Sequence, residues 1–158
     1  MHTILRQYGG KQFFPLLALV IACGGEEPQI LNVHMVLNQT QEALKERFGE
    51  PDISVRRAKN IDTMQWKSAD GDSTWVYVVV RDGRSCYVTY TFKNMEPFDG
   101  EGALRRLGIE APTDEPEYVW ENGVKRWKPF GRYEKLTLSP ITKAVTVGAV
   151  SPLLTSDG

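Results

Sequence analysis

The segment Thr74–Phe92, TWVYVVVRDGRSCYVTYTF, indicates the fold most directly. Two runs rich in β-branched and aromatic residues, Thr74–Arg81 and Arg84–Phe92, flank the dipeptide Asp82-Gly83. Asp-Gly suits a type I′ turn, in which both central residues have positive φ. The segment therefore predicts an antiparallel β-hairpin.

Further strands are expected on both sides of this hairpin. The polar, basic stretch Asp52–Asn60 is interpreted as a connection. Asn122-Gly123 is a second turn dipeptide and predicts another hairpin. The additional strands are expected at Asp62–Lys67, in the two arms of Tyr118–Trp127, at Tyr133–Ser139 and at Lys143–Val150.

Two short helices are predicted. Asn38–Phe48 has Thr40 as a candidate N-cap, and Gly49 and Pro51 end it. A second helix is expected at Asp99–Leu107, with Asp99 as its cap. The apolar run Ile30–Leu37 is compatible with a strand or with a lead-in to the first helix, because periodicity does not separate the two.

These elements predict an α+β fold, with an antiparallel sheet of about five to seven strands packed by two short helices. Residues 29–158 are expected to form a single domain. The order of helix, glycine, proline, polar link and Trp-bearing strands occurs twice, which suggests a weak duplication covering about residues 38–92 and 99–150.

Among 158 residues, 41% are hydrophobic and 25% charged, and the net charge is −1. This composition excludes a disordered tail or a fibre and offers no basic excess for nucleic acid.

Residues 1–22 have the pattern of a signal peptide. Arg6 and Lys11 precede the apolar run Phe13–Ala22, and small residues follow it. Ten helical residues span about 15 Å, roughly half of the hydrocarbon core of a bilayer, which argues against a membrane-spanning anchor. Two alternatives stay open: a cytosolic protein that buries this segment, and a soluble secreted protein cleaved near Ala22.

Val20-Ile21-Ala22-Cys23 resembles the bacterial lipobox. The resemblance implies cleavage before Cys23, attachment of diacylglycerol to its thiol and acylation of the new amino terminus. Residues 23–28 would then be the lipidated cysteine and a tether, and lipid on Cys23 would hold the protein to a membrane. The expected location is the bacterial cell envelope, at the outer membrane facing the periplasm in a Gram-negative source.

Residues 38–92 also resemble the small outer-membrane lipoproteins of the SmpA/OmlA type and their wider β-lactamase-inhibitor-like fold group. The resemblance is carried by Thr40, Leu44 and Phe48-Gly49-Glu50-Pro51, and by the strand Thr74-Trp75-Val76-Tyr77. It implies an envelope lipoprotein fold and a scaffolding role.

The sequence has no catalytic constellation, and no cofactor or metal is expected. Gly100-x-Gly102 lacks the preceding strand and the lysine of a phosphate-binding loop. Asp70-Gly71-Asp72 predicts a turn rather than a calcium loop. Once the signal is removed, His34 is the only histidine, and Cys86 is expected to be a small packed side chain.

Strand aromatics are the candidate binding residues, because Trp and Tyr dominate interface hot spots. The first hypothesis is a non-enzymatic lipoprotein that binds another envelope protein. The alternative is a periplasmic or surface module for a small ligand or glycan, and an enzyme is a third hypothesis. The residues proposed for binding are Trp66, Trp75, Tyr77, Trp120 and Trp127.

Overall fold

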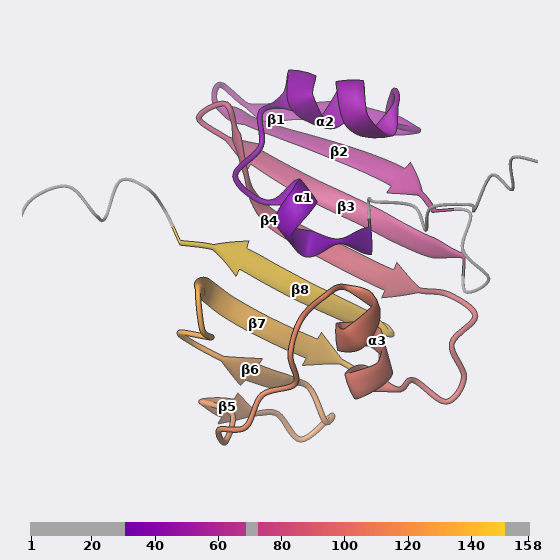
Figure 1. The fold of residues 1–158 in the computed structure, drawn as a ribbon, viewed down its shortest axis with the longest axis vertical. Helices are drawn as coiled ribbons and strands as arrows, with labels where there is room; N and C mark the ends of the chain where they lie inside the picture. Colours follow the sequence, from indigo (N-terminus) through magenta and orange to yellow (C-terminus); the bar gives the residue numbers. More distant parts are fainter. Residues whose placement is uncertain (1–30, 69–72, 151–158) are drawn as a thin grey trace, which may run out of the picture.

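The structure is a computed structural model and describes residues 31–68 and 73–150. Its centre is one antiparallel sheet of eight strands in the order β1-β2-β3-β4-β8-β7-β6-β5 (Figure 1). The predicted signal peptide, Cys23 and the tether lie outside the described residues. The strands are β1 Ile53–Ala58, β2 Ile61–Lys67, β3 Thr74–Arg81, β4 Arg84–Phe92, β5 Tyr118–Val119, β6 Lys125–Trp127, β7 Tyr133–Ser139 and β8 Ala144–Ala149.

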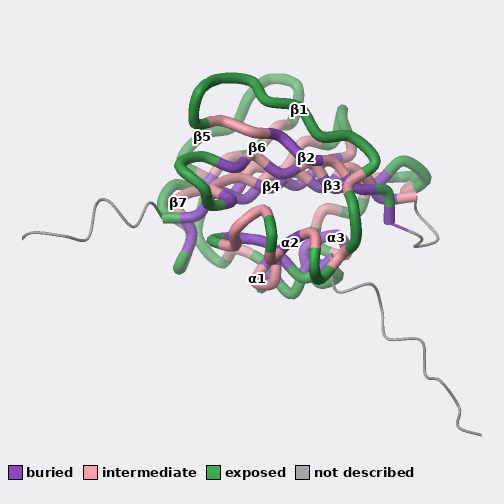
Figure 2. Tube along the Cα trace, turned by 90° about the horizontal axis from the view of Figure 1, so that it is seen from above, coloured by how far each residue is buried: buried purple, intermediate pink, exposed green. Residues whose placement is uncertain are grey.

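Three short helices lie on one side of this sheet (Figure 2). They are α1 Val33–Val36, α2 Gln41–Phe48 and α3 Gly100–Arg106. The predicted caps are confirmed, because the side chain of Thr40 accepts a hydrogen bond from the backbone N–H of Ala43 and that of Asp99 accepts one from Gly102. No helix among the described residues is long and apolar enough to cross a membrane.

The predicted central hairpin is confirmed at its turn. Asp82 and Gly83 have φ values of 49° and 80°, as a type I′ turn requires. The strands that follow from it, β3 and β4, have the predicted bounds.

Two predictions about the elements were wrong. The sheet has eight strands rather than five to seven, and α1 is a third helix. The extra strand β1 lies within Asp52–Asn60, which was predicted to be a connection. All six of its residues are exposed, so it lacks the buried alternation that marks a strand, and backbone pairing with β2 is what forms it. The coarser α+β assignment agrees with the structure, which is mostly sheet.

The core lies between the sheet and the helices. Where β4 pairs with β8, Val88 is the cross-strand neighbour of Val147 and Tyr90 that of Val145, and all four side chains are fully buried. Leu44 of α2 and Leu104 of α3 are buried against this layer. Apolar residues on alternate strand positions therefore face the helices, which leaves the other positions for the opposite side of the sheet.

The two halves of the chain run through the same order of elements. In the first half α2 precedes β1–β4, and in the second α3 precedes β5–β8. The last strands of the halves, β4 and β8, pair antiparallel at the middle of the sheet. A common origin of residues 38–92 and 99–150 stays a prediction.

Candidate functional site on the open face of the sheet

The side of the sheet opposite the helices is formed by three rows of cross-strand neighbours, which we call the open face. One row crosses all eight strands, because paired residues of an antiparallel sheet point to the same side. This central row is Ile53, Gln65, Tyr77, Thr89, Thr146, Thr137, Arg126 and Tyr118. The flanking rows are Val55, Thr63, Val79, Tyr87, Gly148 and Lys135, and Lys67, Trp75, Thr91, Ala144 and Ser139.

Aromatic and hydroxyl side chains dominate the middle of the open face. Trp75 and Tyr77 project from β3, and Tyr87 projects from β4. Beside them the hydroxyl groups of Thr89 and Thr146 are 3.0 Å apart and join β4 to β8. All five residues are partly exposed, so they could contact a partner without rearrangement of the backbone.

The Tyr87 ring is held against the sheet by its neighbours. A Cβ at position 148 would lie 2.6 Å from the Tyr87 Cε1, so glycine at this position gives the ring its space. The Nζ of Lys135 lies 4.6 Å from the ring centroid, and the Tyr87 hydroxyl donates to the Glu134 carboxylate at 3.4 Å. Burial and then Glu134 raise the pKa of Tyr87, which keeps the hydroxyl protonated as a donor.

The edge of the sheet formed by β5 and β6 carries a second cluster of aromatic side chains. The rings of Tyr118 and Trp120 have centroids 4.6 Å apart, and the Arg126 guanidinium lies 5.7 and 5.4 Å from them. Arg126 also donates to Glu117 at 3.1 Å. Tyr118 is 50% exposed and Trp120 37% exposed. This edge is thus an exposed apolar patch around one neutralised cation.

Two of the five predicted binding residues do not lie on this surface. Trp66 and Trp127 face the helix-covered side and are 5% and 7% exposed. Each indole N–H donates to a backbone carbonyl, Trp66 to Gly49 and Trp127 to Asp114. We correct their role to core packing, because buried rings with satisfied N–H groups are not available to a partner.

The other three predicted residues are at the surface, although not all in one place. Trp75 and Tyr77 are neighbours in the middle of the open face, whereas Trp120 is at the distant edge. The candidate list omitted Tyr87 and Tyr118. For Tyr87 the signal was present in the sequence, since it alternates with the core residue Val88 in the same way as Thr89.

A hollow of about 500 Å³ adjoins the open face beside Tyr87. Its lining includes Arg81, Arg84, Cys86 and Ala149. The Cys86 thiol lies 3.5 Å from the carbonyl of Val79, and burial raises its pKa. It therefore stays a protonated thiol at neutral pH and is a poor nucleophile.

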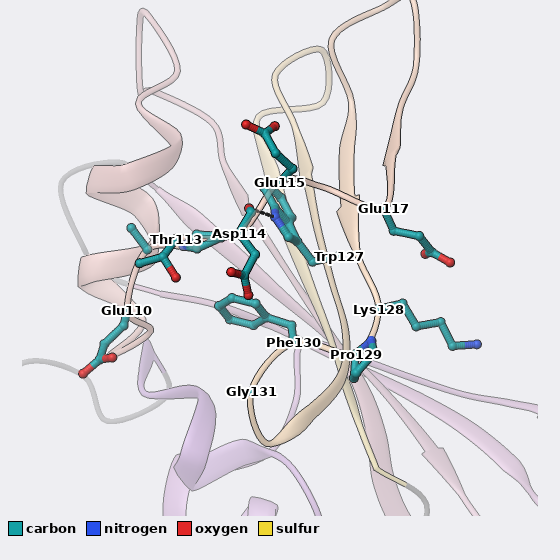
Figure 3. A pocket seen from close by; sticks show the side chains of 12 residues that line it. Glu110, Thr113, Asp114, Glu115, Glu117, Trp127, Lys128, Pro129, Phe130 and Gly131 are labelled. Atoms are coloured by element: carbon teal, nitrogen blue, oxygen red, sulfur yellow. Dashed lines mark hydrogen bonds between the residues drawn. The ribbon is translucent and has the colours of Figure 1, made fainter.

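A second hollow, of about 360 Å³, has an acidic rim (Figure 3). It lies between the link 110–117 and the turn 127–131. The Asp114 carboxylate points toward the Phe130 ring, whereas Glu110 and Glu117 point outward. No group of three or more His, Cys, Asp or Glu among the described residues is placed to hold a metal ion.

His34 of α1 is the centre of a polar cluster at the helix side. Its Nδ1 lies 2.6 Å from an Arg132 guanidinium nitrogen and 2.8 Å from the Tyr133 hydroxyl. Because a guanidinium can only donate hydrogen bonds, its contact with His34 favours the neutral imidazole, which keeps a ring nitrogen free to accept. Burial and then the charge of Arg132 lower the pKa of His34.

This lowered pKa predicts a loss of stability on mild acidification. The unfolded chain has a histidine pKa near 6.5 and takes up the proton first, so the free energy of unfolding falls as the pH drops from about 7.5 to 5.5. In His34→Gln that decrease is expected to be smaller. Denaturant titrations at several pH values measure it, and an equal slope in both proteins would contradict the predicted role of His34.

Comparisons with family models, curated proteins and solved structures found no match to this chain.

Proposed function

We propose that this protein is a non-enzymatic lipoprotein of the bacterial envelope that binds another envelope protein through the open face. The observation that carries the proposal is the central row, which runs uncovered across all eight strands and brings Tyr77 and Tyr118 onto one side of the sheet.

The dimensions of the open face support a protein partner. The eight strands contain 48 residues in all, spaced about 4.8 Å apart across the sheet and about 3.3 Å apart along each strand. The product is about 800 Å², which is the area that each partner contributes to a stable interface of ordinary size. A small ligand would cover only a fraction of it.

The chemistry of the open face supports the same partner class. Interface cores are poor in charge and rich in aromatic residues. Trp75, Tyr77 and Tyr87 meet this description, and Tyr87 is already held in place by Gly148 and Lys135. Because these side chains stand on a continuous hydrogen-bonded sheet, little of the backbone has to become ordered when a partner binds.

The anchoring part of the proposal rests on the lipobox resemblance at Cys23. Two or three acyl chains hold a protein stably to a bilayer, whereas one chain binds only marginally. A lipid-anchored domain with an uncovered sheet face suits a scaffolding role.

The lipid anchor is tested by replacing Cys23, the residue proposed to accept the lipid. In a bacterial host the wild-type protein is expected in the membrane fraction, starting at residue 23 and carrying the mass of its lipid. Cys23→Ser is expected to lose that lipid mass and to leave the membrane. Intact-mass spectrometry with fractionation measures both, and a wild-type protein that is soluble and keeps residues 1–22 would contradict the lipoprotein assignment.

The binding face is tested by cross-linking in the source cells. A photo-reactive amino acid at Thr137, in the central row, is expected to form a discrete adduct with one envelope protein. Trp75→Ala and Tyr77→Ala are each expected to weaken the adduct about fivefold or more, since hot-spot residues contribute over 1 kcal/mol.

Glu46→Ala on α2 is the matched control and is expected to leave the adduct unchanged, because Glu46 is exposed on the helix side. Thermal unfolding verifies that all variants are folded. An adduct that responds to Glu46 and not to Trp75 or Tyr77 would contradict binding through the open face.

The alternative, a module for a small ligand or glycan, is favoured by the hollow beside Tyr87. Glycans that quench tryptophan fluorescence saturably, with no protein adduct at Thr137, would select it.

A further inference from the structure

Charge is distributed unevenly between the two sides of the sheet. The three rows of the open face contain Lys67, Lys135 and Arg126 and no Asp or Glu. The protein as a whole carries a net charge of −1. The carboxylates of the described residues lie instead in the helices, the turns, the link 110–117 and at strand positions outside these rows. The rows themselves therefore contribute only cations, and carboxylates reach them from neighbouring positions, Glu134 at the Tyr87 hydroxyl and Glu117 at Arg126.

The three cations differ in how far they are neutralised. Arg126 is paired with Glu117 at 3.1 Å. Lys67 and Lys135 have no carboxylate within ion-pair distance among residues 31–68 and 73–150, and the Lys135 ammonium lies over the face of the Tyr87 ring. Two cations are thus available to an incoming surface.

The register fixes how far apart these two lysines are. Lys67 on β2 and Lys135 on β7 are separated by four strand spacings, through β3, β4 and β8. The row of Lys67 contains Trp75 and the row of Lys135 contains Val79, so along the strands the two rows are four residues apart. Four spacings of about 4.8 Å and four residues at about 3.3 Å give a diagonal of about 23 Å between their positions. Trp75, Tyr77 and Tyr87 lie in the rows between and beside them.

We propose that the partner of the open face is a folded protein that presents two carboxylate groups about 23 Å apart, opposite Lys67 and Lys135, on either side of an apolar centre. This rests on the proposed function. An ammonium group that is covered loses its hydration, so a partner that covers the face has to supply the missing negative charges.

An anionic lipid surface does not fit this pattern as well. Polybasic segments that bind anionic lipid have clusters of about four to eight Lys and Arg residues. The open face has only two unpaired cations, at opposite corners, with aromatic and threonine side chains between them. A rigid surface with two separate acidic positions matches this spacing.

Zero-length cross-linking tests the proposal on the full-length protein in membranes of the source cells. A carbodiimide joins a lysine amine to a carboxylate that it touches. Peptide mapping is expected to find Lys67 and Lys135 each joined to an Asp or Glu of one partner chain. Lys67→Arg and Lys135→Arg keep the charge but cannot form the amide, so each is expected to lose its own cross-link and to retain the Thr137 photo-adduct.

Charge reversal gives the second readout. Lys67→Glu and Lys135→Glu are each expected to reduce the Thr137 photo-adduct at least about tenfold. Lys45→Glu on α2 is the matched control and is expected to change it little. Circular dichroism confirms the fold of each variant.

Three results would overturn the inference. One is a Thr137 photo-adduct that neither charge reversal weakens, in which case the proposed function holds without an acidic partner. Another is co-flotation of the Cys23→Ser protein with vesicles of 30% phosphatidylglycerol that both reversals abolish, which would assign the lysines to lipid. The third is the absence of any Thr137 adduct, which would remove the proposed function as well.

Discussion

The structure depends most on the pairing between β4 and β8. Five residues of β4, Tyr87–Thr91, pair antiparallel with Ala144–Gly148 of β8, and this one ladder joins two four-stranded halves into a continuous sheet. On one side it buries Val88 and Val147 against the helices. On the other it aligns Thr89 with Thr146, so that the central row crosses from one half to the other. Without it each half would expose an apolar edge and lose much of its core.

That pairing also separates the two roles of the sheet. Because side chains alternate, every strand of the middle contributes to the core and to the open face at once, and a register slip of one residue would exchange them. Gly148 shows how closely the two are linked, since it belongs to the pairing that joins the halves and also provides the space in which Tyr87 lies. The binding surface that we propose is therefore a consequence of the way in which the core is assembled.

Local elements could be predicted from the sequence because their signals are local. Asp82-Gly83 determined the hairpin, and Thr40 and Asp99 determined two helix starts. The edge strand β1 could not be predicted in this way, because its exposed ISVRRA sequence has no buried face, although it pairs with β2 across only Lys59 and Asn60. Trp66 was predicted to bind a partner from its residue type alone. Its position in β2, between the polar residues Gln65 and Lys67, already puts it on the same side of the sheet as Met64. The pairing of β4 with β8, which creates the open face, joins segments too distant for any local pattern to predict.

Hydroxyl-radical footprinting of the full-length protein tests most directly whether the open face is the surface that meets a partner. It compares the purified protein with the protein in its native membranes and reads oxidation residue by residue. We expect Trp75, Tyr77 and Tyr87 to be protected in membranes, while Phe48 and Met95, which pack against the helix-side core, oxidise equally in both samples. Equal oxidation of the three open-face aromatics in both samples, with protection confined to the helix side, would contradict an interaction through the open face.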